Sequence, residues 1–189
     1  FNYAFKLLMF PGILGQTIIQ MTLLPWFVRM RLRQPAAMTS TYGATLQIAW
    51  ASALAVSLAV SLAGEPIAAL CFGYGKMTED DIRTVGSLIA IGIWATPGMV
   101  LSYVWLQILY THEQTRAPLI ANMIHAALIA PLCFLGHLAG GQEGTLAAYA
   151  AAQLIPLALL ARSGRAYMGM VPSRNYVLIT AAVIGAFLP

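Results

Sequence analysis

Residues 41–63 read TYGATLQIAWASALAVSLAVSLA and contain no charged side chain. A helix that crosses the hydrocarbon core of a bilayer needs about 20 consecutive apolar residues, so this stretch predicts a membrane-spanning helix. Small residues recur along it at four-residue spacing: Ala51, Ala55, Ala59 and Ala63. This spacing places them on one face, where a neighbouring helix can approach closely. We interpret that face as a packing surface rather than a binding site.

The composition of the whole chain extends this conclusion. Of its 189 residues 60% are hydrophobic and 8% are charged, and the mean hydropathy is +0.77. A soluble domain carries about 25% charged residues, so this chain has too few to cover a globule. A soluble enzyme, a disordered tail and a nucleic-acid-binding protein are excluded, and the scattered Lys and Arg form no basic stripe. We expect an all-α, polytopic transmembrane helix bundle, with residues 1–189 forming a single transmembrane region.

Six apolar runs are candidate membrane spans. They cover residues 3–28, 41–63, 85–110, 119–138, 146–160 and 176–188. Prolines lie inside four of them and predict kinks there. A kinked span is tolerated where neighbouring groups satisfy the carbonyls that the proline leaves without a partner. These are Pro11, Pro97, Pro131 and Pro156. Both ends of the chain fall within apolar runs, with no initiator Met and no signal peptide, so we expect a fragment of a longer protein.

Charged residues predict how these spans are oriented. Basic residues gather in alternate connections: Arg29, Arg31, Arg33, Arg116, Arg162, Arg165 and Arg174. The other connections carry most of the acidic residues: Glu65, Glu79, Asp80, Asp81 and Glu143. By the positive-inside rule, the first span runs from the outside to the cytoplasm, and the segment 64–83 is an outer loop. Thr78 and the three acids after it predict a helix N-terminus within that loop.

The first span carries the residues that most suggest a binding site. Lys6 lies in it, and a charge inside a bilayer is costly and usually faces a cavity. At about 100° per residue, the polar side chains fall within an arc of roughly 100° on one helix face. They are Asn2, Lys6, Gln16, Thr17 and Gln20. We predict that this polar stripe faces a cavity of protein or water; the alternative is that Lys6 snorkels to the interface.

The remaining motifs predict neither catalysis nor metal binding. The segment 112–116 begins with His-Glu but lacks the second histidine of HExxH, and no three metal ligands are grouped in the sequence. The letters GYGK at 73–76 lack the rest of a P-loop and of a potassium-channel filter, so we interpret them as a turn. We therefore expect no enzyme activity and no cofactor.

Two further pairs of residues are interpreted as structural. Asn122 and His125 are three residues apart in the fourth span, which favours an interhelical hydrogen-bond pair over a proton relay. Cys71 and Cys133 both lie in apolar runs and are expected to be buried, inert thiols.

Three stretches of the chain resemble a known family. The first has YAFKL at 3–7, PGILG at 11–15 and LP at 24–25. The second has EPI at 65–67, FG at 72–73 and Thr78, and the third has Tyr110, TR at 115–116 and Pro118. In this order and spacing they are similar to the lipid II flippase family (MurJ/MviN), within the multidrug/oligosaccharidyl-lipid/polysaccharide exporter superfamily. The resemblance covers nearly the whole chain and corresponds to helices eight to thirteen of fourteen.

The resemblance implies a function as well as a fold. Such flippases have two helical lobes around a cavity whose basic side chains hold the pyrophosphate of an undecaprenyl-linked sugar carrier, and the lobes rock to alternate access. It implies a location in the bacterial cytoplasmic membrane, with a lipid-linked oligosaccharide, the bilayer and cell-wall synthesis proteins as partners. Lys6 falls at the family's arginine in Y-A-D-R-L, and Phe5 replaces its aspartate. The alternatives are a flippase for O-antigen or exopolysaccharide units, and a non-transporting membrane scaffold of the same fold.

Overall fold

The computed structural model describes residues 2–74 and 77–167, excluding the side chains of 2–5 and 7–11. All regular structure in this part of the chain is helical, which confirms the expected all-α class. The α-helices described are α1 (Asn2–Arg33), α2 (Met38–Leu62), α3 (Gly64–Phe72), α4 (Glu79–Gly92), α5 (Ala95–Thr111), α6 (Arg116–Ala152) and α7 (Leu154–Gly164). Two 3-10 turns, η1 (Pro35–Ala37) and η2 (Arg165–Tyr167), follow α1 and α7.

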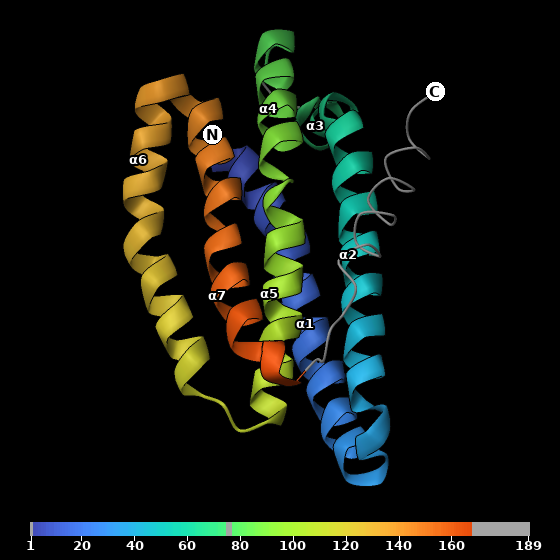
Figure 1. Ribbon diagram of the computed structural model, residues 1–189. Helices are drawn as coiled ribbons and strands as arrows, with labels where there is room; N and C mark the ends of the chain where they lie inside the picture. Colours follow the sequence, from blue (N-terminus) through green and yellow to red (C-terminus); the bar gives the residue numbers. More distant parts are fainter. Residues whose placement is uncertain (1, 75–76, 168–189) are drawn as a thin grey trace.

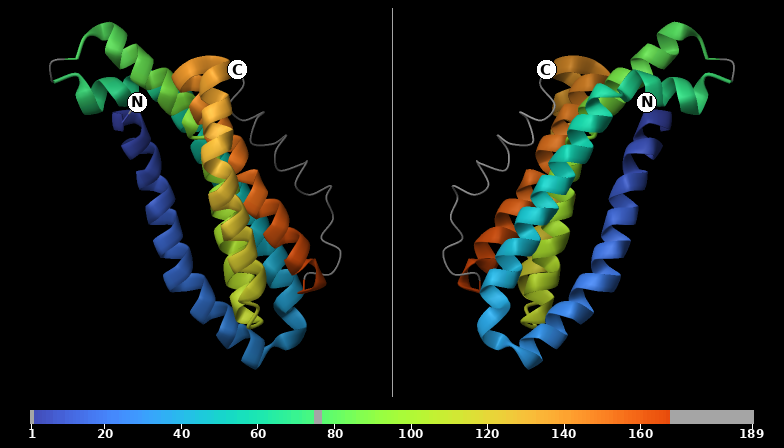
Figure 2. Two further views of the ribbon diagram at one scale, coloured as in Figure 1. Left: turned by 90° about the vertical axis from the view of Figure 1, so that its left-hand side faces the viewer. Right: turned by 90° about the vertical axis from the view of Figure 1, so that its right-hand side faces the viewer.

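The long helices run back and forth along one axis (Figures 1 and 2). In Figure 1 α1 descends, α2 returns, and α4 and α5 form one column that descends again beside them. Three helical segments of the described chain are long and apolar enough to cross a membrane: Pro35–Leu62, Glu79–Thr111 and Arg116–Tyr167. The first predicted span lies within α1, and the sixth, at 176–188, falls outside the described residues.

The helix α6 is a hairpin of two antiparallel arms rather than one rod. Gly140 and Gly141 have non-helical backbone angles, and the φ of +60° at Gly141 suits glycine better than any other residue. The arms pack closely because Gly136 and Gly144 face each other: a Cβ on Gly136 would lie 2.3 Å from the carbonyl oxygen of Gly144. The predicted fourth and fifth spans are thus joined by two glycines, and the segment Arg116–Tyr167 passes along the bundle twice.

Two helix breaks lie where kinks at proline were predicted, but each break precedes its proline. The column bends at Ile93 and Trp94, between α4 and α5, and Pro97 is the third residue of α5. Likewise Gln153 separates α6 from α7, and Pro156 is the third residue of α7. A proline in the first turn of a helix needs no partner for a missing N–H, so it is tolerated there. The predicted positions are therefore corrected by a few residues.

The neighbouring helix satisfies backbone groups at the first break. Ser57 on α2 donates its hydroxyl hydrogen to the carbonyl of Ile93 at 3.3 Å, and Ser61 donates to that of Ala90 at 3.1 Å. The two breaks also meet: a Cβ on Gly98 would lie 2.9 Å from the Cβ of the buried Gln153. The bundle therefore has two adjacent discontinuities near mid-height, each held by packing or by hydroxyl groups.

The segment expected to be an outer loop contains a helix. α3 occupies residues 64–72 and packs on α4, where Gly64 and Gly86 allow the two backbones to touch. Thr78 is the N-cap of α4 and forms a capping box with Asp81, which confirms the predicted helix start. The expectation of a plain loop was wrong because the run IAALCF is too short to stand out beside the long spans but buries Ala68 against α4.

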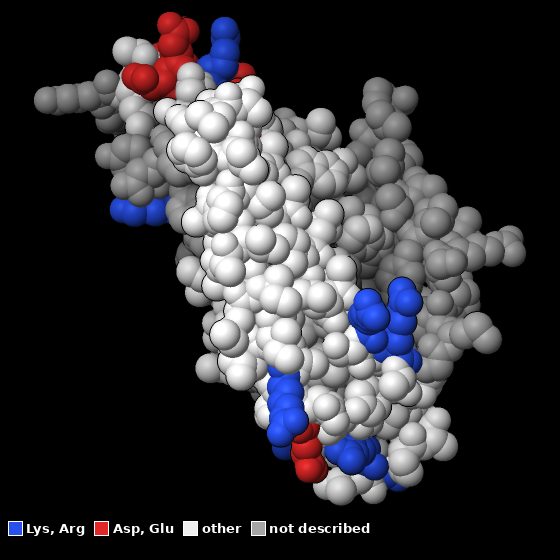
Figure 3. Space-filling view, turned by 60° about the vertical axis from the view of Figure 1, so that its left-hand side comes forward, with Lys and Arg blue, Asp and Glu red and all other residues white. Residues whose placement is uncertain are grey.

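Most charges of opposite sign lie at opposite ends of the bundle, although Arg83 lies near the acids at the start of α4 and Glu113 lies just before α6, near the arginines (Figure 3). We call the end where α1 ends, α6 begins and α7 ends the basic end; its arginines are Arg29, Arg31, Arg33, Arg116, Arg162 and Arg165. The acidic end carries α3 and the start of α4, with Glu65, Glu79, Asp80 and Asp81. The predicted separation of charge holds for most of the described residues, whereas Arg174 lies outside them. The assignment of the basic end to the cytoplasm stays a prediction.

Candidate functional site

The predicted polar stripe lies on α1, which is helical through Pro11. Lys6, Thr17 and Gln20 are exposed and Gln16 is half-buried, while the side chain of Asn2 lies outside the described residues. The face of α1 that packs on the core, with the buried Gly12 and Phe27, lies next to the stripe and not opposite it. The structure thus brings Lys6, Thr17 and Gln20 onto one open flank and leaves Gln16 at its edge.

This flank is not enclosed by the part of the chain that the structure describes. Ile13, Ile18 and Met21, next to the stripe, are 57%, 60% and 73% exposed. Thr17 meets its own hydrogen-bonding need by donating to the carbonyl of Ile13 at 2.9 Å, as hydroxyls in membrane helices commonly do. The cavity predicted for the stripe therefore requires a wall from outside the described residues.

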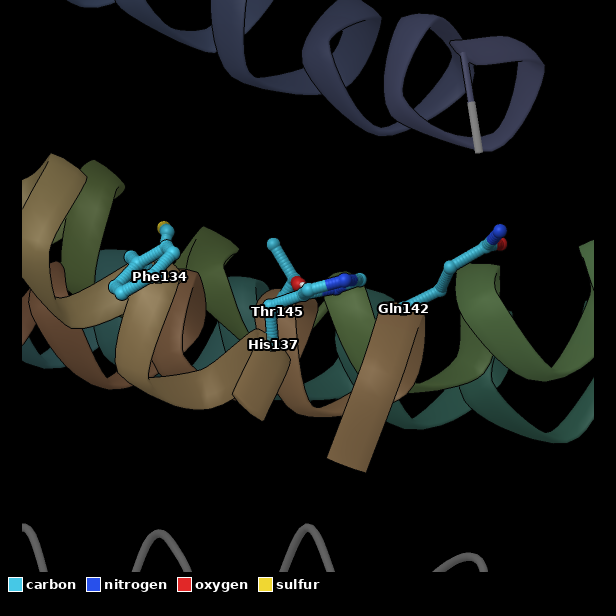
Figure 4. Close-up of a pocket in the computed structure, with 5 residues that line it drawn as sticks. Phe134, His137, Gln142 and Thr145 are labelled. Atoms are coloured by element: carbon cyan, nitrogen blue, oxygen red, sulfur yellow. Dashed lines mark hydrogen bonds between the residues drawn. The ribbon is translucent and has the colours of Figure 1, made fainter. Parts of the chain in front are cut away.

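A pocket near the acidic end lies beside the path of α1 (Figure 4). It has a volume of about 430 Å³ and is lined by Cys133, Phe134, His137, Gln142 and Thr145, from the two arms of α6. In Figure 4 Gln142 and Thr145 extend from α6 on the side where the first turns of α1 pass. Thr145 Oγ1 and His137 Nδ1 lie 3.4 Å apart, so the two arms share a polar contact there.

This pocket was not predicted from the sequence. Its residues come from both sides of the turn at Gly140 and Gly141, and only the hairpin makes them neighbours. The pair of adjacent glycines between two apolar runs was the signal available for it. Cys133 was expected to be buried and is half-buried at the pocket, while Cys71 is exposed on α3, so the prediction of two buried thiols was wrong. The apolar segments that carry the two cysteines lie on the outer surface of the bundle and not in its core, as the exposed neighbours Leu70 and Phe134 show.

Among the described residues, the interhelical hydrogen-bond pair expected in the fourth span is also not formed. Asn122 is exposed, and the half-buried His125 has a buried Nε2 without a hydrogen-bond partner among the described residues. The two side chains lie on the same helix, three residues apart. Spacing in the sequence identified the shared face but not what lies against it.

A cluster at the basic end ties four elements together. The hydroxyl of Tyr42 on α2 is hydrogen-bonded to Nε2 of His112 at 3.2 Å, and the His112 ring stacks on Tyr167 of η2 at 4.0 Å. Arg31 at the end of α1 donates to the carbonyl of Thr111, the last residue of α5. Burial and the Arg31 guanidinium both lower the pKa of the His112 imidazole. His112 was interpreted as a loop residue, and the structure makes it the centre of this contact.

This lowered pKa predicts a pH-dependent stability. The unfolded chain binds a proton at His112 more readily than the folded chain. The free energy of unfolding is therefore highest above about pH 6.5 and decreases as the pH is lowered through that value. In the intact protein, thermal melting in detergent at pH 7.5 and 5.5 should show this loss. His112→Phe keeps the stacking on Tyr167 and removes the titration, so its Tm should change less; an equal change in both proteins would contradict the assignment.

No grouping of three His, Cys, Asp or Glu side chains within residues 2–74 and 77–167 could hold a metal ion. The chemical content of the candidate site is therefore a cationic and amide-rich flank on α1 beside a mostly apolar pocket on α6. Such an arrangement can bind a ligand that joins an anionic group to an apolar body.

The comparisons with known proteins rest on structure. No family model matches the chain, and no curated protein matches its sequence. A solved structure of the lipid II flippase MurJ, in an inward closed conformation, is similar with a TM-score of 0.76 and 14% sequence identity. The match covers 93% of this chain and 37% of the flippase chain, so this chain spans little more than a third of that protein. The chain has the fold of one part of a lipid II flippase.

Proposed function

We propose that this chain is part of a flippase that moves undecaprenyl-pyrophosphate-linked peptidoglycan precursor, lipid II, across the bacterial cytoplasmic membrane by alternating access. The observation that carries the proposal is the match of nearly the whole chain to part of a lipid II flippase. The motifs at 3–15, 65–78 and 110–118, which resemble the same family in order and spacing, support it from the sequence.

In this proposal the exposed flank of α1 is the wall of a cavity whose other side belongs to a second lobe. Lys6 is the one charged residue between Asn2 and Val28, and it is exposed. A diphosphate that leaves water needs a counter-charge, because Coulomb attraction and the cost of an unpaired charge both grow as the dielectric constant falls. Lys6 supplies that charge, and Gln16, Thr17, Gln20 and Asn2 supply hydrogen bonds to phosphate or sugar oxygens.

The two departures from the family motif define what this site can do. A lysine in place of arginine keeps the charge but loses the planar, two-point contact with phosphate oxygens. With Phe5 in place of an aspartate, Lys6 has no carboxylate neighbour at that position in the chain. The lysine is therefore free to pair with the substrate, and its binding depends more on charge than on geometry.

Complementation tests the proposal. The intact gene, including any first lobe, is expected to restore growth and outward lipid II movement in bacteria depleted of their own lipid II flippase. Membrane insertion is checked by surface labelling of a cysteine placed at the exposed position of Tyr74. A well-inserted protein that fails to rescue would contradict the lipid II assignment. Transport of O-antigen or exopolysaccharide units would then assign the protein to the flippases of those units. Transport of neither would favour a non-transporting scaffold of this fold.

A further inference from the structure

A second pocket opens at the basic end, away from the polar stripe. It has a volume of about 560 Å³ and lies between the start of α6 and the end of α7. Its polar lining comes from Gln114, Arg116, Arg162 and Ser163. Its apolar lining comes from Ala117, Ile120, Ala121 and Leu159. Each helix contributes both kinds of residue.

The two kinds of lining are separated along the bundle axis. On α6, Arg116 is the first helical residue and Ile120 follows one turn deeper. On α7, Arg162 lies in the last turn and Leu159 lies three residues before it, again deeper in the bundle. A turn of helix rises 5.4 Å, so the pocket changes from cationic at its mouth to apolar within one turn. A ligand that fits it is anionic at one end and apolar at the other.

The charges at the mouth are available to a ligand. Arg116 and Arg162 are both exposed, and in the described residues neither forms an ion pair with a carboxylate. Thr115, the N-cap of α6, makes no side-chain cap, so the positive end of this helix adds to the potential of the two guanidinium groups. Arginine matches phosphate oxygens with two parallel hydrogen bonds, and two such groups from different helices can hold one phosphate.

A pocket of similar size at the acidic end provides the contrast. It has a volume of about 620 Å³, and its charged lining consists of Glu65, Glu79 and Arg83. Two carboxylates beside one guanidinium do not favour an anion. The cationic, amphipathic lining is therefore a property of the pocket at the basic end and not of helix ends in this bundle generally.

We propose that the pocket between α6 and α7 binds the phosphate headgroup of an anionic glycerophospholipid, with the start of an acyl chain along Ile120 and Leu159. The bilayer around the protein supplies this lipid, and the arginines at the basic end concentrate anionic headgroups there. The apolar half of the pocket distinguishes a lipid from free phosphate, since Ile120 is 55% exposed there and an acyl chain would cover it.

The test uses the intact protein in neutral detergent, titrated with short-chain phosphatidylglycerol, short-chain phosphatidylcholine or inorganic phosphate and followed by native mass spectrometry. Phosphatidylglycerol is expected to bind at least about tenfold more tightly than phosphatidylcholine. The double variant Arg116→Gln, Arg162→Gln should lose that preference, whereas Arg83→Gln in the acidic-end pocket should keep it. Equal Tm values for the variants and wild type establish that folding is unchanged.

A third variant separates the two sources of phosphate. Ala117→Leu places a larger side chain in the apolar half without changing any charge, so it should weaken phosphatidylglycerol binding several-fold. Inorganic phosphate that binds as tightly as the lipid, with no effect of Ala117→Leu, would overturn the lipid assignment. Retention of the lipid preference by the double arginine variant would overturn the site itself.

Discussion

Replacing Lys6 with alanine in the intact protein should abolish rescue of flippase-depleted bacteria. The side chain is exposed on α1 and is the one charge in the first 28 residues, so no neighbour in that stretch can take over its role. A hydrogen bond to a charged group contributes about 1.5–3 kcal/mol, and each 1.4 kcal/mol is about tenfold in affinity. We therefore expect diphosphate binding to fall by about ten- to a hundredfold, and growth and outward lipid II movement to fail together.

Two variants make this result specific. Lys6→Arg keeps the charge and restores the residue of the family motif, so it should support growth. Arg83→Ala removes an exposed positive charge from α4 outside the polar stripe and should also support growth. Rescue by Lys6→Ala at wild-type expression would contradict the assignment of Lys6 to the substrate site. Failure of Lys6→Arg in a correctly folded protein would contradict the placement of Lys6 at the family's arginine.

Replacing Gly136 with valine should cause a large loss of stability, because this residue lies in the close contact between the two arms of the α6 hairpin. A Cβ at this position would lie 2.3 Å from the carbonyl oxygen of Gly144 and 2.6 Å from the Cβ of Ala148, so the two arms must separate. Overpacking of this kind costs about 1–3 kcal/mol, and here the contact is with backbone that cannot rotate away. Thermal melting of the intact protein in detergent should show a lower Tm.

Gly140→Ala is the matched control. Gly140 lies in the same hairpin, but a Cβ there meets no atom within 4 Å, and its φ of −155° is open to alanine. Its Tm should stay close to that of the wild type. Because the separation of the arms also changes the pocket lined by His137 and Thr145, Gly136→Val should increase labelling of Cys133 by a thiol reagent. A Tm of Gly136→Val equal to that of Gly140→Ala would contradict the close contact of the arms.

Features that depend on local chemistry were predictable from the sequence. The run 41–63 is long and uncharged and forms most of α2. Thr78 caps α4 because its hydroxyl oxygen accepts from the N–H of Asp81 while the Asp81 carboxylate accepts from the N–H of Thr78. The separation of acidic from basic residues follows directly from which connection each occupies. The polar stripe could be located on one face of α1, since a continuous helix fixes the angle between residues.

Features that depend on contacts distant in sequence were not predictable. Tyr42 and His112 are 70 residues apart, and nothing near either residue indicates the other. The pocket beside α1 requires the hairpin at Gly140 and Gly141, and the pocket at the basic end requires α7 to return beside the start of α6. The break before Pro97 was displaced from its predicted place because the hydroxyl groups of Ser57 and Ser61 stabilise carbonyls earlier in the column.

The two adjacent helix breaks divide the bundle into cooperative units. One hydrophobic core, with Tyr42, Val104 and Leu160, lies on the basic side of the breaks, and a smaller one, with Ala68, Leu88 and Leu146, lies on the acidic side. The α4–α5 column is interrupted between the two cores, whereas α2 passes both without a break, so α4 is the segment of the column that can open with the smaller core. Hydrogen exchange is expected to show amide protons of α4 exchanging through a lower-energy opening than those of α5.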